Sequence, residues 1–146
     1  MLNKFIIFGV VIFVIAGLGF AFYIFINVKT NESISNNSVV RVIDGDTFEL
    51  ASGDIVRLLC IDSPELEQEG SIESRNFLSS LILGKEVILE SDVLDKDDYG
   101  RLLRYVYLNE TSELIFVNKM IFEQGFSEML IIPPADFLCG EIGGEV

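Results

Sequence analysis

Residues 39–61, VVRVIDGDTFELASGDIVRLLCI, contain three short β-rich runs separated by tight turns. The runs are Val39–Val42, Phe48–Leu50 and Ile55–Ile61, and the turn signals between them are Asp44-Gly45-Asp46 and Ser52-Gly53-Asp54. Three strands joined by turns of this length form a meander. The stretch therefore predicts the first half of a domain built on a β-sheet.

The chain that follows alternates between helical and strand patterns. Apolar residues recur at helical spacing from Ile72 to Ile82, and Gly84 is a good helix stop. The later elements are a strand at Glu86–Glu90, a strand at Leu102–Leu108, a short helix at roughly Val117–Gln124 and a return to the sheet at Phe126–Ile132. This order predicts an α+β, mainly β, domain over residues 39–134: a five-stranded OB-type Greek-key barrel with two helices. Residues 135–146 are expected to be a C-terminal tail that is too short and too rich in glycine for a good helix.

The first part of the chain has a different composition. Residues 5–28 carry no charge, and about 20 apolar residues are enough to cross a bilayer. We therefore expect a short tail at residues 1–4, a transmembrane helix at 5–28 and a polar linker at 29–38. A cleavable signal peptide ending near Gly19-Phe20-Ala21 is the alternative. The expected protein is a single-pass membrane protein with its domain outside the cytoplasm, and the lysines that flank the span, Lys4 and Lys29, orient it only weakly.

Charge and composition restrict the chemistry. Two of the ten basic residues precede Thr30, which leaves eight basic and 23 acidic residues, a net charge of −15, in the rest of the chain. Such a surface repels polyanions in general. The absence of histidine excludes imidazole catalysis and His-ligated zinc. Cys60 and Cys139 are the two cysteines; a disulfide between them and a buried thiol at Cys60 both remain open.

Four polar patches interrupt the apolar framework. They are Asp44-Gly45-Asp46-Thr47, Arg57, Asp62-Ser63-Pro64-Glu65 and Asp98-Tyr99-Gly100-Arg101. Each has a plain interpretation as a turn, an acidic loop or an arginine on the solvent face of a strand. Together they supply what phosphodiester cleavage needs. Carboxylates can ligate a hard cation and accept a proton from water, and guanidinium groups pair with phosphate oxygens.

Four segments also resemble the staphylococcal nuclease (thermonuclease) family. These are VIDGDTFEL, VRLLCIDSPE, DKDDYGRLLRYVYL and FVNKMIFEQGF, which occur in the family's order and at its spacings between about Val39 and Ile132. The resemblance implies calcium-dependent cleavage of DNA and RNA, with a 3′-phosphate product. It assigns a role to each site residue: Asp46, Asp62 and the Ser63 carbonyl as Ca²⁺ ligands, Asp44 as a second acidic residue near the metal, Glu65 as the group that activates water, Arg57 and Arg101 as the phosphate clamp, and Tyr99 as a phosphate contact.

The chain also departs from this family in ways that weaken substrate binding. The loop LEQEGSI, residues 66–72, lacks the family's lysines, and Asp98 stands where the family has a lysine. Residues 127–134, SEMLIIPP, have no aromatic to stack on a base, and the usual third helix is missing. We expect a membrane-tethered nuclease acting on nucleic acid, with single-stranded substrates favoured, and no sign of an oligomer. The alternatives are a non-catalytic barrel that binds nucleic acid or protein, and a calcium-binding surface protein.

Overall fold

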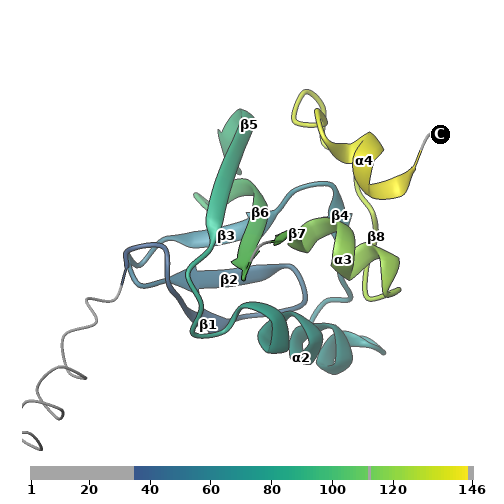
Figure 1. Ribbon diagram of the computed structural model, residues 1–146. Helices are drawn as coiled ribbons and strands as arrows, with labels where there is room; N and C mark the ends of the chain where they lie inside the picture. The colour runs from purple at the N-terminus through teal and green to yellow at the C-terminus, as the bar shows by residue number, and fades with distance from the viewer. Residues whose placement is uncertain (1–34, 112, 145–146) are drawn as a thin grey trace, which may run out of the picture. The chain divides into compact units, whose positions relative to one another are not determined.

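The β-rich runs form a mixed sheet in the computed structural model, which describes residues 35–111 and 113–144 (Figure 1). The strands of this sheet are β1 (Val39–Val42), β2 (Thr47–Leu50), β3 (Ile55–Leu58), β5 (Ile88–Lys96), β6 (Leu102–Glu110) and β7 (Glu113–Phe116). Their order is β1-β2-β3-β6-β5, and β7 pairs with β6. β3 and β6 are parallel, and the other pairs are antiparallel. The α+β class predicted from the sequence is confirmed.

Backbone hydrogen bonds also join the two ends of the five-strand order. Val39 N donates to Lys85 O at 2.9 Å, and Val87 N donates to Asn37 O at 3.1 Å. Ser38 and Glu86 form an antiparallel bridge between these bonds. The start of β1 therefore pairs with the segment just before β5, as expected for a small barrel.

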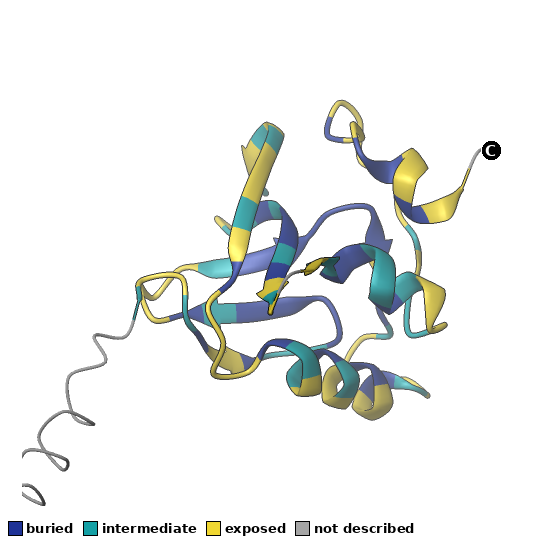
Figure 2. Ribbon diagram, viewed as in Figure 1, coloured by how far each residue is buried: buried dark blue, intermediate teal, exposed yellow. Residues whose placement is uncertain are grey.

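The described residues also form three helices, of which the first two pack against this sheet and the third packs against the second. They are α2 (Ser71–Ile82), α3 (Val117–Glu123) and α4 (Cys139–Gly143). The buried face of α2 includes Leu78 and Ile82, which join a core with Phe48 and Val106, while the opposite face is exposed (Figure 2). The helix forms because its apolar residues recur on one side, and that side covers the barrel core.

The third predicted strand is interrupted at Leu59 and Cys60. β3 ends at Leu58, Cys60 has a φ of 65°, and the chain resumes as β4 (Ile61–Asp62), which pairs with β8 (Glu128–Met129). The buried amide of Asn118 supports this turn: its Nδ2 donates to Leu59 O at 2.9 Å, and its Oδ1 accepts from Val106 N at 2.9 Å. The interruption moves Asp62 off the main sheet. The predicted strand at residues 126–132 is correspondingly reduced to β8.

The expectation of a tail without a good helix was wrong, because residues 135–143 pack on the core. α4 forms there, and Ala135, Leu138, Cys139 and Ile142 are buried. A disulfide joins Cys139 to Cys60. The Tyr105 hydroxyl accepts from Leu138 N at 3.1 Å and donates to Asp92 at 2.7 Å, and Asp92 also accepts from Phe137 N at 3.0 Å. A covalent bond and hydrogen bonds with Tyr105 and Asp92 thus replace the length and helix propensity that the segment lacks.

The expected membrane-anchored, single-pass topology is corrected. None of the helices in the described ranges, 35–111 and 113–144, is long and apolar enough to cross a membrane. The predicted span at residues 5–28 and most of the predicted linker lie outside the described residues.

Candidate active site

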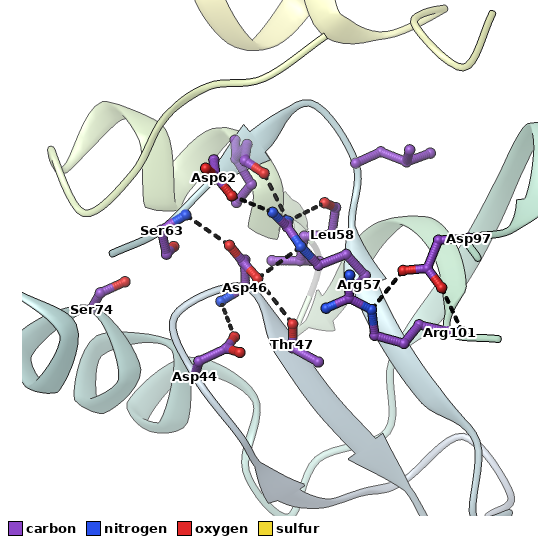
Figure 3. A network of polar contacts seen from close by, with 12 residues as sticks. Asp44, Asp46, Thr47, Arg57, Leu58, Asp62, Ser63, Ser74, Asp97 and Arg101 are labelled. Carbon is purple, nitrogen blue, oxygen red and sulfur yellow. Dashed lines mark hydrogen bonds and ion pairs between the residues drawn. The ribbon is translucent and has the colours of Figure 1, made fainter. Parts of the chain in front are cut away.

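Asp46 is the most buried carboxylate among the predicted site residues. It lies just before β2, and only 4% of it is exposed. Its Oδ2 accepts from Ser63 N at 2.7 Å, and its Oδ1 accepts from the Thr47 hydroxyl at 2.9 Å and pairs with Arg57 Nε at 3.0 Å (Figure 3). Burial raises the pKa of Asp46 well above its usual range, and the Arg57 charge only partly opposes this shift. A cation near Asp46 therefore favours the ionised form.

Arg57 links the two aspartates that the sequence predicts as metal ligands. Its Nε pairs with Asp46, and its Nη2 pairs with Asp62 at 2.6 Å. Its Nη1 donates to Leu58 O at 2.8 Å and to Ile61 O at 2.7 Å. All three guanidinium nitrogens are engaged, so the orientation of the group is fixed. The carbonyls that hold Nη1 flank the turn between β3 and β4, which makes this turn part of the site.

Gly45 provides the close backbone approach that the loop before β2 requires. The loop is stabilised by Asp44 Oδ1, which accepts from Asp46 N at 3.0 Å. A Cβ at Gly45 would overlap the Ser74 hydroxyl and lie 2.7 Å from Ser63 Cβ. Because α2 carries Ser74 and β4 leads into Ser63, a side chain here would push apart the elements that position the site.

We expect Gly45→Ala to destabilise the fold by about 1–3 kcal/mol, the usual cost of overpacking. Thermal or urea unfolding measures the change. Gly45→Ala combined with Ser74→Ala should recover part of the loss, because it removes the hydroxyl with the worst overlap. Equal stability of Gly45→Ala and the wild type would contradict the packing described here.

Asp97 holds the second arginine in place. Its Oδ1 accepts from Tyr99 N at 3.0 Å and from Arg101 N at 2.9 Å, and its Oδ2 pairs with Arg101 Nε at 2.6 Å. Burial alone would raise the pKa of Asp97, but the hydrogen bonds and charge of Arg101 outweigh it and hold the pKa below its usual value. Sequence reasoning missed this residue. The signal was present, since an aspartate often bonds the backbone two residues ahead at the start of a turn.

A cleft of about 490 Å³ brings most of the predicted site together. Its polar lining includes Arg57, Asp62, Glu65, Tyr99 and Arg101. Arg101 points toward Arg57 in Figure 3 and lies 5.4 Å from the centre of the Tyr99 ring. Tyr99 is 86% exposed and therefore free to meet a ligand. Asp44, Asp46 and Ser63 do not line this cleft. Asp46 is connected to it only by the ion pair with Arg57, which does line it.

The cleft also contains residues that sequence reasoning did not select. Lys96 lies at the end of β5, and the apolar wall consists of Leu94, Leu103, Leu130 and Ile132. Aliphatic residues and a single lysine form no motif that a sequence alone would reveal. Only the fold shows that these segments meet.

The donor set suits an oxygen-ligated cation such as Ca²⁺. Asp46 and Asp62 both form ion pairs with the guanidinium of Arg57. The buried Ser63 hydroxyl has no hydrogen-bond partner among the described residues. No group of three or more acidic, histidine or cysteine side chains in the described part of the chain is arranged to hold a metal. A calcium ion here would thus take two carboxylates and complete its six to eight ligands with carbonyl and water oxygens.

Comparison with known proteins identifies the family of the domain. The family model described as "Staphylococcal nuclease homologue" matches residues 55–136, which include all the residues of the cleft. A thermonuclease of Staphylococcus intermedius is 33% identical over 108 residues, covering 67% of this chain and 61% of the relative. Endonuclease YncB of Bacillus subtilis is 30% identical over 116 residues, covering 71% and 52%. An endonuclease of Escherichia coli is 40% identical over 72 residues, covering 47% and 46%.

The chain thus spans about half to three fifths of the length of these relatives. The family match covers more than half of the chain and contains Arg57, Asp62, Glu65 and Arg101 in one cleft. By sequence and by the fold that positions these residues, the chain belongs to the staphylococcal nuclease family.

Proposed function

We propose that this protein is a nuclease that hydrolyses phosphodiester bonds of DNA or RNA with Ca²⁺, leaving the 3′-phosphate that the family resemblance implies. The observation that carries the proposal is the cleft lined by Arg57, Arg101, the carboxylates of Asp62 and Glu65, and the exposed Tyr99. The names of the thermonuclease and endonuclease relatives support the same activity. A barrel that served only to bind would have no need for Glu65 in the same cleft as two guanidinium groups.

The residues of the cleft have separate roles in the proposed hydrolysis. Glu65 is exposed at the cleft and accepts the proton of the attacking water, whose oxygen forms the new bond to phosphorus. Arg57 and Arg101 donate hydrogen bonds to the phosphate oxygens as their negative charge grows. The bond from phosphorus to the leaving oxygen breaks, and that oxygen takes a proton from solvent.

Asp46, Asp62 and Ser63 are the residues proposed to hold the calcium ion. When bound, the ion supplies Lewis-acid and orienting chemistry at the phosphate. Asp46 and Asp62 both pair with Arg57, so the two carboxylates are directed toward one guanidinium group. Of the two, the buried Asp46 gains more from an added cation, because its charge is the more poorly solvated.

The test is cleavage of single-stranded DNA by the purified full-length chain. We expect cleavage with millimolar Ca²⁺ and its loss on addition of EDTA, with recovery when excess Ca²⁺ is restored. End-labelling of the products identifies the side that retains the phosphate. Absence of cleavage by folded protein in Ca²⁺ would refute the proposal and favour the non-catalytic barrel.

A further inference from the structure

Lys96 is the last residue of β5 and lines the cleft beside both arginines of the proposed site. It is exposed. It is followed directly by Asp97, the residue that orients Arg101. The position places a flexible primary ammonium group in the lining of the cleft that would receive the phosphate.

The Lys96 side chain has no acidic or hydrogen-bonding partner among the described residues, unlike every other basic side chain in those ranges. Five of the others pair with carboxylates outside the Asp46–Arg57–Asp62 cluster, Arg57 lies within that cluster, and Arg75 donates to Val42 O. The five pairs are Arg41–Glu49, Lys85–Glu110, Arg101–Asp97, Arg104–Asp95 and Lys119–Glu123. Lys96 therefore offers the cleft a positive charge that no carboxylate of the described chain already neutralises.

A polyanionic substrate needs such a charge here. The chain from Thr30 onward has eight basic and 23 acidic residues, and the loop after Glu65 contains glutamates instead of lysines. Asp98 adds a negative charge on the rim of the cleft. Each phosphate contact by a lysine releases counterions and contributes to affinity. Few groups in the described part of this cleft can supply that contribution, and Lys96 is the one without a competing partner.

We propose that Lys96 is a substrate-positioning residue that binds a phosphate of the nucleic acid strand next to the phosphate undergoing cleavage. The inference rests on the proposed nuclease function. The competing interpretation is structural, since an exposed lysine at the end of an outer strand also discourages pairing with other strands. The two interpretations differ in what they predict for substrate affinity and its dependence on salt.

The experiment compares Lys96→Ala, Lys96→Arg and Lys119→Ala in the full-length chain. Lys119→Ala is the control, because it removes the same charge from a half-buried site outside the cleft. Cleavage kinetics in Ca²⁺ give KM and kcat. Fluorescence anisotropy with a labelled eight-nucleotide single-stranded DNA gives Kd in the Glu65→Gln background at 50 and 200 mM NaCl. Thermal unfolding shows that each variant is folded.

We expect Lys96→Ala to raise KM and Kd about fivefold with kcat changed less than twofold, and Lys96→Arg to restore both. The loss of affinity between 50 and 200 mM NaCl should be about 2.6-fold smaller in Lys96→Ala, since one contact to a single strand contributes a slope of about 0.7. Lys96→Ala behaving like Lys119→Ala, or no binding of the DNA at all, would overturn the inference. Binding that depends on Lys96 without any cleavage would support it and refute the nuclease function instead.

Discussion

Glu65→Gln is expected to lower kcat for phosphodiester cleavage by about 10²- to 10⁴-fold, the usual contribution of a general base. Glutamine has nearly the same shape but cannot accept the proton of the attacking water. The side chain of Glu65 makes no hydrogen bond or ion pair with the described residues, although its backbone N bonds Gln68 at 3.0 Å. The substitution should therefore leave the fold and the substrate Kd unchanged. Single-turnover cleavage of single-stranded DNA measures the effect.

Glu67→Gln is the matched control for this prediction. Glu67 is an exposed glutamate two residues away that does not line the cleft. Its replacement changes the net charge by the same amount and should leave kcat within about twofold, as expected for a screened surface charge. A similar loss in both variants would assign the effect to charge rather than to proton transfer. Full activity of Glu65→Gln would remove Glu65 from the proposed mechanism.

Loss of the disulfide is expected to destabilise the domain by about 4 kcal/mol, which corresponds to roughly 20 °C in Tm for a domain of this size. The bond joins Cys60 and Cys139, which are 79 residues apart, and both are buried. A crosslink over a loop of this length strongly restricts the unfolded chain. The double variant Cys60→Ser and Cys139→Ser measures the effect by thermal or urea unfolding.

A dithiol reductant provides the independent measurement. Reduction of the wild type should lower its Tm by about as much as the two substitutions, while the double variant should not respond to the reductant. Agreement between the two measurements assigns the loss to the bond and not to the added hydroxyls. A wild-type Tm that is unchanged after verified reduction would show that packing alone holds the C-terminal segment.

The residues of the site were more predictable from the sequence than the way in which they are held. Arg57, Asp62, Glu65, Tyr99 and Arg101 stand out because polar patches interrupt the apolar runs within or beside predicted strands. The fold then brings these strand ends to one cleft. The roles assigned to these residues remain proposals, and the experiments above are designed to test them.

The supporting contacts could not be predicted because they depend on pairs distant in sequence. Asn118 fixes the turn at Leu59 across 59 positions, and Ser74 sets the space available to Gly45. Neither contact can be predicted from a local sequence pattern. The same limit explains α4, whose sequence has poor helix propensity. The Cys60–Cys139 disulfide and the burial of Leu138 and Ile142 outweigh that propensity.

The position of Cys139 relative to Cys60 also has a consequence for the order of folding. The barrel needs residues 37–39 to meet 85–87 and β3 to meet β6, so its strands can associate once about residue 110 has been synthesised. The turn between Arg57 and Asp62 gains its covalent support only when residue 139 arrives. On the ribosome, a nascent chain would therefore form its barrel first and fix this turn last. The proposed nuclease activity would then appear only after the segment that closes the core is available.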